Sequence, residues 1–228
     1  STRKESSAAS DVYKRQVDGT VSGVNLFSGK SGSGKSTVMD AIQVILYGSF
    51  SPSFLNKAAD DAKNRRSVLS YLRGEQKDGS ANRKDCDFCS VIALEIEDTG
   101  THIITCIGIA FEVRKSDSEI KKFVYFSHSG KMPESEYLTE QGVCYSNQEI
   151  KKLVSARTKS DDNRGKGEVN RIYGSKEAYL GTLYDVILGY IDQNRFITME
   201  KSAIALKMTN GTGQFIRCLL YTSPSPRD

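Results

Sequence analysis

The chain has 228 residues, of which 38% are apolar and 26% charged, and its 32 Lys and Arg residues stand against 28 Asp and Glu residues. This is the composition of an ordinary globular protein with one or at most two domains, and it excludes a collagen-like, purely coiled-coil or wholly disordered chain. No run approaches the ~20 apolar residues of a membrane helix, and residues 1–16 lack the apolar segment of a secretory signal. We therefore expect a soluble, cytoplasmic protein with no membrane partner.

A short apolar run, residues 23–28, predicts a buried strand. It leads into the segment Gly29–Ser36, and residues 37–47 then carry apolar side chains at helical spacing. Gly48 follows as the expected C-terminal cap of that helix. A strand, a glycine-rich loop and a helix in this order are the context that a phosphate-binding loop (P-loop) requires.

The segment Gly29–Ser36 matches the pattern G-x-x-x-x-G-K-[ST] in full. Its glycines allow successive backbone N–H groups to surround an anion, and the positive end of the helix points at the same place. Lys35 supplies a charge for the β- and γ-phosphates and is the predicted catalytic residue, while the Ser36 hydroxyl is the predicted Mg²⁺ ligand. The predicted ATP-binding residues are Gly29, Lys30, Ser31, Gly32, Ser33, Gly34, Lys35, Ser36 and Thr37.

The middle of the chain predicts an antiparallel meander. A short helix over residues 65–72 ends at Gly74, and three strand-like segments follow at residues 88–97, 102–113 and 122–128. Their connections are short, which favours antiparallel neighbours.

Three helices are expected in the rest of the chain. Ser146 and Glu149 form a capping-box pattern that opens a helix over residues 150–155. Ser175 is placed to cap a helix over residues 176–190, and Thr198 is the predicted start of a helix that ends near Met208.

The residues 151–176, which we call the basic loop, hold a cluster of Lys and Arg side chains with only three acids. Such a cluster is either a contact for the phosphate backbone of DNA or a solvated loop, and the sequence leaves both open. The predicted DNA contacts in it are Lys151, Lys152, Arg157 and Lys159.

Other candidate chemical groups favour ordinary roles. Cys86 and Cys89 form an isolated C-x-x-C without the two further ligands that zinc needs, and the odd number of cysteines argues against a disulfide framework. His102 and His128 lie at strand positions with no paired acid nearby. Two apolar runs followed by an acid, ending at Glu95 and Asp192, imitate the Mg²⁺-binding carboxylate of an ATPase, but the first fits a meander strand and the second a helix.

The stretch Asn25–Gly48, with Asp40-Ala41-Ile42 after the P-loop, resembles the N-terminal head segment of SMC-like ATPases, the structural-maintenance-of-chromosomes, Rad-type repair and MukB group. Residues 54–58 and 71–74 are similar to the MukB-like branch of Wadjet plasmid-defence systems, the JetC or MksB ATPase. The resemblance implies an α/β fold: a P-loop NTPase of the ABC-type SMC head, N-terminal lobe, with an antiparallel β-meander subdomain. It also implies that a coiled coil and a C-terminal lobe with the signature motif and Walker B carboxylates follow.

The resemblance also carries roles for single residues and partners. Arg73 is similar to the family's R-loop arginine, which links bound nucleotide to DNA, and Gln214 to its Q-loop glutamine, a catalytic residue that senses Mg²⁺ and the attacking water. The implied cofactors are ATP and Mg²⁺. The implied partners are non-specific duplex DNA, a second head joined through the C-terminal lobe, and kleisin-type subunits. The full-length protein is expected to hydrolyse ATP, and this chain alone to be inactive.

Both ends of the chain resemble translated sequencing-adapter reads, at residues 12–16 and 218–228. We therefore expect three segments: a non-native or disordered tail at residues 1–16, the P-loop ATPase head lobe at residues 17–217, and a second tail at residues 218–228. Two other functions stay open, namely a smaller P-loop enzyme such as a nucleotide kinase or GTPase, built on a parallel sheet, and a nucleotide-gated module that does not hydrolyse ATP.

Overall fold

The computed structural model describes residues 34–52, 55, 67–75, 79–161 and 169–204. The expected strand at residues 23–28, the loop residues 29–33, Gln214 and both tails lie outside the described residues. The elements in chain order are α1 (Lys35–Tyr47), α2 (Val68–Arg73), β1 (Phe88–Glu97), β2 (Ile104–Val113), β3 (Lys122–Ser129), α3 (Asn147–Asp161), β4 (Arg171–Tyr173), α4 (Lys176–Gly181), the π-helical turn η4 (Thr182–Ile187) and α5 (Gln193–Ile204).

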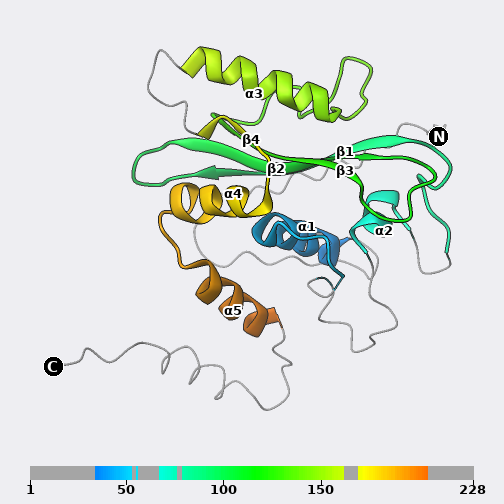
Figure 1. The fold of residues 1–228 in the computed structure, drawn as a ribbon, viewed down its shortest axis with the longest axis horizontal. Coiled ribbons are helices and arrows are strands. Elements are labelled where there is room, and N and C mark those ends of the chain that lie inside the picture. The colour runs from blue at the N-terminus through cyan, green and yellow to red at the C-terminus, as the bar shows by residue number, and fades with distance from the viewer. Residues whose placement is uncertain (1–33, 53–54, 56–66, 76–78, 162–168, 205–228) are drawn as a thin grey trace, which may run out of the picture.

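One antiparallel sheet in the order β1-β2-β3-β4 organises the described part of the molecule. Helix α3 covers one face of the sheet, and α1, α2 and α4 lie along the other (Figure 1). Ile109 of β2 pairs with Ile92 of β1 and with Tyr125 of β3, and Tyr125 pairs in turn with Tyr173 of β4. The predicted meander is therefore confirmed, while β4, three residues long, was missed inside the basic loop.

The strands bury both faces because their side chains alternate between two apolar clusters. Ile107, Ile109 and Phe111 of β2 enter the cluster on the α1 side, whereas Ala110 enters the cluster on the α3 side. In the described residues the α1-side cluster is much the larger, with 16 buried residues against 5. The helix that follows the P-loop pattern thus packs on the main core.

The first helix ends as its sequence predicts. Gly48 takes a left-handed conformation, with φ of 53°, and its N–H bonds to the Ile45 carbonyl oxygen. A residue with a Cβ atom is strained there, which explains why glycine ends the helix. The short second helix ends in the same way at Gly74, with φ of 66°.

Helix α3 is longer than predicted, and most of the supposed N-terminal half of the basic loop is helical. The capping box is confirmed, since the Ser146 N–H donates to Glu149 Oε2 at 2.7 Å and the Glu149 N–H donates to Ser146 Oγ at 3.3 Å. Ile150 and Val154 then continue a buried stripe at i, i+4 spacing. The helix predicted over residues 150–155 is therefore confirmed but too short, because the charged outer face concealed its continuation through residues 156–161.

Two boundaries near the C-terminus also differ from expectation. Helix α5 begins at Gln193 and not at Thr198, because the Asp192 carboxylate accepts the Arg195 N–H at 2.7 Å and caps the helix. The helix predicted over residues 176–190 starts with the Ser175 cap, as expected, but passes into the π-helical turn η4 and ends at Ile187. None of the helices described has the length and apolar character needed to span a bilayer.

Candidate functional site

The amino end of α1 is built to receive an anion. Gly34, directly before the helix, has φ of 84°, a conformation that glycine adopts without strain. The first intrahelical bond runs from the Val38 N–H to the Gly34 carbonyl at 3.2 Å, so the preceding N–H groups have no intrahelical acceptor. The first turn contains no acidic residue. N–H donors without an intrahelical acceptor, the helix dipole and a first turn without an acid fit a phosphate group.

The structure describes only part of the predicted nucleotide-binding residues. Gly34 and the backbone of Lys35 and Ser36 belong to the described amino end of α1, and Thr37 is exposed there. The other predicted residues, 29–33, lie outside the described residues, as do the side chains of Lys35 and Ser36. The roles of Lys35 with the phosphates and of Ser36 with Mg²⁺ therefore stay predictions from the sequence.

A buried carboxylate, that of Asp40, lies in α1 about one helical turn after its amino end. Asp40 is only 5% exposed, and it accepts a hydrogen bond from the Tyr71 hydroxyl at 2.5 Å. Tyr71 belongs to α2, so the bond joins the P-loop helix to the short helix beside it. The sequence drew attention to Asp40 as part of a family pattern, but nothing local indicated Tyr71 as its partner.

The carboxyl end of α1 is held by three tyrosine hydroxyl groups. Tyr125 donates to the Gly48 carbonyl at 2.6 Å, Tyr179 to that of Ile45 at 3.1 Å, and Tyr184 to that of Leu46 at 2.9 Å. Carbonyl oxygens at the end of a helix lack the i+4 donors of its interior, and these hydroxyls supply donors there, in addition to the Gly48 N–H at the Ile45 carbonyl. The sequence analysis missed this arrangement because the partners are 77, 134 and 138 residues apart in the chain.

Burial keeps these tyrosines protonated. It raises the pKa of Tyr125 and of Tyr184 to about 12, and that of Tyr179 well above its usual value. All three therefore remain hydrogen-bond donors throughout the physiological pH range. Helix α5 adds a further contact to α1, because the Gln43 amide donates to Glu200 Oε1 at 2.9 Å. The P-loop helix is thus fixed along its length by the sheet, α2, α4, η4 and α5.

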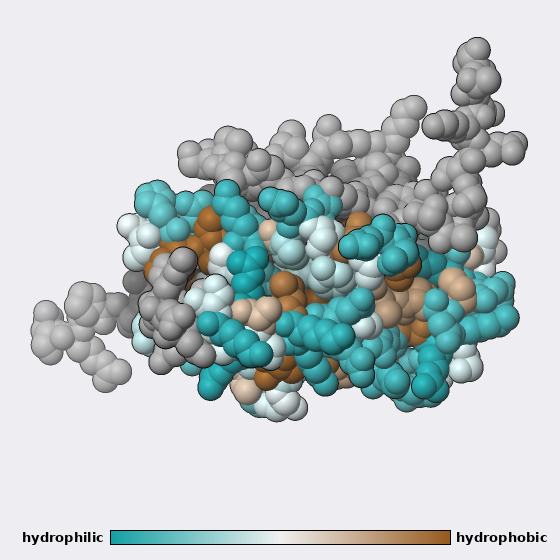
Figure 2. Space-filling view, turned by 90° about the horizontal axis from the view of Figure 1, so that it is seen from above, coloured by the Kyte–Doolittle hydropathy of each residue, from teal (hydrophilic) through white to brown (hydrophobic). Residues whose placement is uncertain are grey.

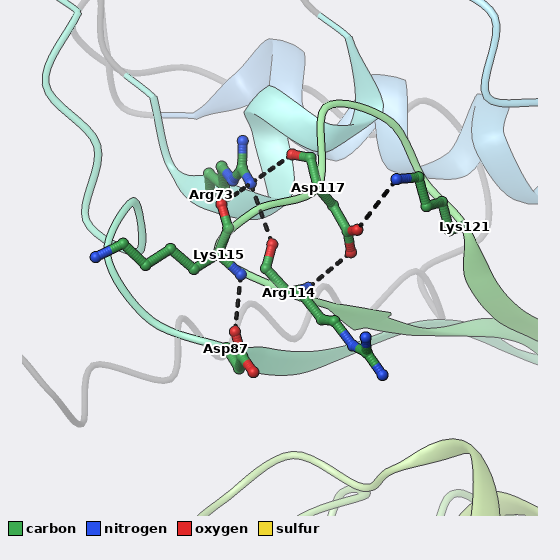
Figure 3. A network of polar contacts seen from close by, with 6 residues as sticks. All are labelled: Arg73, Asp87, Arg114, Lys115, Asp117 and Lys121. Carbon is green, nitrogen blue, oxygen red and sulfur yellow. Dashed lines mark hydrogen bonds and ion pairs between the residues drawn. The ribbon is translucent and has the colours of Figure 1, made fainter.

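Arg73 is committed to the fold rather than extended into solvent. Its Nη2 donates to three carbonyl oxygens of the β2–β3 turn, those of Arg114 at 3.3 Å, Lys115 at 3.1 Å and Asp117 at 2.7 Å. Figure 3 shows the guanidinium beside this turn. The turn is itself closed by the Arg114 N–H bonded to the Asp117 carboxylate, which lowers the pKa of that carboxyl. Arg73 thereby links α2, and through it α1, to the tip of the meander.

The predicted DNA contacts do not form one surface. Lys151, Lys152 and Lys159 are exposed on α3, whereas Arg157 is partly buried and donates to the Lys131 carbonyl at 3.4 Å. The view from the α3 side is mostly hydrophilic, with apolar patches between the polar side chains (Figure 2). Arg73 lies with α2 on the opposite face of the sheet (Figure 1). The sequence had grouped cations that the fold separates.

Glu95 and Asp192, the two acids whose sequence context resembles that of an Mg²⁺-binding carboxylate, do not lie at the amino end of α1. Glu95 belongs to β1 and accepts the Met132 N–H at 2.7 Å, and Asp192 caps α5. No group of three or more His, Cys, Asp or Glu side chains could hold a metal ion among the residues described. Cys86 and Cys89 are free thiols, and burial raises the pKa of Cys89 to about 11.

The two histidines differ from one another. His102 is exposed and its Nδ1 lies 2.9 Å from Glu97 Oε1, so the expectation that it has no acidic partner was wrong. His128 is fully buried on the α3 side of the sheet. Its Nε2 lies 2.8 Å from the Tyr137 hydroxyl and its Nδ1 lies 3.0 Å from the Ser129 carbonyl oxygen, an arrangement that suits a neutral ring with the proton on Nδ1.

Residues 11–62 match the family described as the P-loop containing region of AAA domain. The match spans the glycine-rich segment and α1, and it agrees with the sequence pattern and with the anion-binding geometry of the helix end. It indicates a nucleotide-binding P-loop NTPase region within a mixed α/β structure. No curated protein and no solved structure matches the chain.

Proposed function

We propose that this chain is the ATP-binding N-terminal head lobe of an SMC-like ATPase that translocates on DNA or extrudes DNA loops, in plasmid defence or chromosome organisation. The observation that carries the proposal is the packing of the P-loop helix against an antiparallel meander. Helix α1 lies on the sheet face formed by β1, β2 and β3, and all described strand pairs are antiparallel.

This arrangement weighs against the other P-loop enzymes. Nucleotide kinases and GTPases follow the P-loop helix with parallel strands joined by helical crossovers, which need a dozen or more residues between strands. Here β1 and β2 are joined by residues 98–103, and β2 and β3 by residues 114–121. An antiparallel subdomain beside the P-loop is what the SMC-like head implies.

In the proposed function the amino end of α1 binds the phosphates of ATP. Gly34 allows the backbone to turn toward the anion, the first N–H groups of the helix donate to it, and Lys35 adds a positive charge. Ser36 is the residue that would hold Mg²⁺, which neutralises phosphate charge when bound. The sheet, and the three tyrosines that bind the carboxyl end of α1, hold the whole helix in a fixed orientation.

The partners in this proposal are the remaining parts of such a machine. A C-terminal lobe would bring the Walker B carboxylates and the signature motif, a second head would complete the ATP site, and kleisin-type subunits would join the heads. Duplex DNA would meet the exposed lysines of α3, whose charges lie on one helix face, or the Arg73 end of the molecule. Such contacts neutralise backbone phosphates without reading sequence.

The direct test is calorimetric titration of the chain with ATP and Mg²⁺. Lys35→Ala should weaken ATP binding by at least about 100-fold, because it removes the charge that faces two phosphates. Lys84→Ala, which changes an exposed lysine elsewhere, should bind ATP like the parent, and circular dichroism should show both variants folded. Equal ATP affinity in the parent and in Lys35→Ala would refute the proposal. Sustained hydrolysis that Lys35→Ala abolishes would show that the chain holds its own metal carboxylate.

A further inference from the structure

Asp40 is the single carboxylate of the P-loop helix, whose sequence is KSTVMDAIQVILY. It is also among the most buried charged residues described, with only 5% of its surface exposed. A carboxylate is expensive to bury, and one that is kept inside a helix beside an apolar core calls for a partner or a task. The Tyr71 hydroxyl is one of its hydrogen-bond partners.

The position of Asp40 along the helix is as informative as its burial. It follows Ser36 by four residues, so the two lie on the same face of α1, about 6 Å apart along the axis. Helical side chains lean toward the amino end of the helix. This lean directs the Asp40 side chain toward the turn that contains Ser36. Asp40, the only acid of α1, thus lies one helical turn after Ser36, the predicted Mg²⁺ ligand.

The bond from Tyr71 keeps this charge in place. Tyr71 packs against the α1-side apolar cluster, while its hydroxyl reaches the Asp40 carboxylate from α2. A hydrogen-bond donor on a separate helix restricts where the Asp40 carboxylate can point. The fold therefore holds the carboxylate in one orientation before any nucleotide arrives.

We propose that Asp40 is an electrostatic positioning residue that makes the site prefer the Mg²⁺ complex of ATP over metal-free ATP. The inference rests on the proposed function, because it needs nucleotide at the amino end of α1. A fixed negative charge attracts Mg²⁺ and repels the phosphates, and both effects are strong where water is excluded. Asp40 touches neither in this proposal; it biases what the P-loop accepts, while Ser36 supplies the ligand atom.

Because the Asp40 charge is expected to favour Mg²⁺–ATP and to disfavour metal-free ATP, the two ligands can be compared in one experiment. ATP affinity is measured by calorimetry for each variant in excess Mg²⁺ and in EDTA, and the ratio of the two dissociation constants is compared. Asp40→Asn removes the charge but keeps an oxygen that accepts from Tyr71. It should weaken Mg²⁺–ATP binding and strengthen metal-free ATP binding, so that the preference for the Mg²⁺ complex falls about tenfold.

Two variants separate charge from structure. Tyr71→Phe removes the hydrogen bond and keeps the carboxylate, so the preference should stay within about threefold of the parent. Asp185→Asn makes the same substitution at an exposed acid of η4, next to the residue that binds the carboxyl end of α1, and should leave the preference unchanged. If Asp40→Asn does not fold, Asp40→Leu with Tyr71→Phe removes the charge together with its partner, and the same tenfold loss is expected.

The outcomes are distinct. Weaker binding by the same factor with and without Mg²⁺ would mean that Asp40 only supports the helix. Unchanged affinity under both conditions would mean that its charge does not reach the metal. Either result overturns the inference and leaves the proposed ATP binding standing. Absence of ATP binding by the parent chain would instead overturn the proposed function.

Discussion

The two faces of the sheet are built on different principles. On the α1 side, a broad apolar cluster carries the P-loop helix, and tyrosine hydroxyls hold that helix through its carbonyl oxygens. On the α3 side, the cluster is small, and one of its members, Tyr137, makes polar contacts with the buried side chains of His128 and Cys106. Helix α3 lies over it with a charged outer face.

This difference indicates that the two faces of the sheet have different roles. A phosphate-binding helix end must stay in place when a highly charged ligand arrives, and close packing along the helix provides that rigidity. The α3 side has no such demand, so a smaller cluster and a polar buried network suffice to attach a surface helix. We expect substitutions on the two faces to separate nucleotide binding from peripheral stability.

The largest effect is expected from truncation of matched isoleucines. Ile107 on the α1 side and Ile150 on the α3 side are both fully buried. Ile107→Ala should cost about 3–5 kcal/mol of unfolding free energy, because its surroundings are closed on every side, whereas Ile150→Ala should cost about 2 kcal/mol, because a surface helix can settle into the space. Urea denaturation of both variants measures the difference.

ATP binding completes that test. Ile107→Ala should weaken ATP affinity where it remains folded, and Ile150→Ala should leave it unchanged. Equal losses of stability together with equal losses of ATP affinity would contradict the division between the two faces, since they would show that the sheet transmits every packing defect to the P-loop helix.

Sequence reasoning succeeded where the signal is local. The apolar spacing of residues 37–47, the caps at Gly48 and Ser146 and the short links of the meander each depend on a few neighbouring residues, and the structure confirms them. The predicted start of α5 at Thr198 was wrong, because the Asp192 carboxylate caps the helix six residues earlier.

The rest of the site depends on contacts between distant segments. The three tyrosines reach α1 from β3, α4 and η4, and Tyr71 reaches Asp40 from 31 residues away. No pattern within one segment encodes such partners. The grouping of Arg73 with the α3 lysines failed to anticipate their separation for the same reason, because charge alone does not reveal which face of a sheet a residue will cover.

A pH dependence should distinguish the α3 side. Burial lowers the pKa of His128, so the folded protein keeps this ring neutral while the unfolded chain takes up a proton near pH 6.5. Its contribution to stability is complete above that pH and is lost as the pH falls toward the folded-state pKa, by at most about 1.4 kcal/mol per pH unit. We expect stability to fall between pH 7 and 5.5, measured as a shift of the urea midpoint to lower concentration.

The control for this experiment is the other histidine. His128→Gln should flatten the dependence between pH 7 and 5.5, while His102→Gln, which changes the exposed histidine, should retain it. The tyrosines on the α1 side, with pKa values raised by burial, do not titrate in this range. A slope that survives His128→Gln would show that another group takes up the proton.

The smallest effect concerns DNA. Counterion release makes binding by lysines fall with salt, with a slope of about 0.9 per neutralised phosphate. Changing Lys151, Lys152 and Lys159 to Gln should weaken binding of a duplex about threefold at low salt and lower this slope, with little change in stability, since the three side chains are exposed. Arg157 is left in place because it bonds to the Lys131 carbonyl. Fluorescence anisotropy against salt concentration measures both quantities.

A second triple variant decides which end of the molecule DNA meets. Lys84, Lys115 and Lys122 are exposed near the β1 and β2–β3 ends, and Lys115 and Lys122 lie close to the carboxylates of Asp85 and Glu112. Because those acids offset their charge, changing the three to Gln should alter DNA binding less than the α3 variant does. The reverse order would place DNA at the Arg73 end of the sheet, on the side of the P-loop helix, and would leave the α3 lysines as solvated surface.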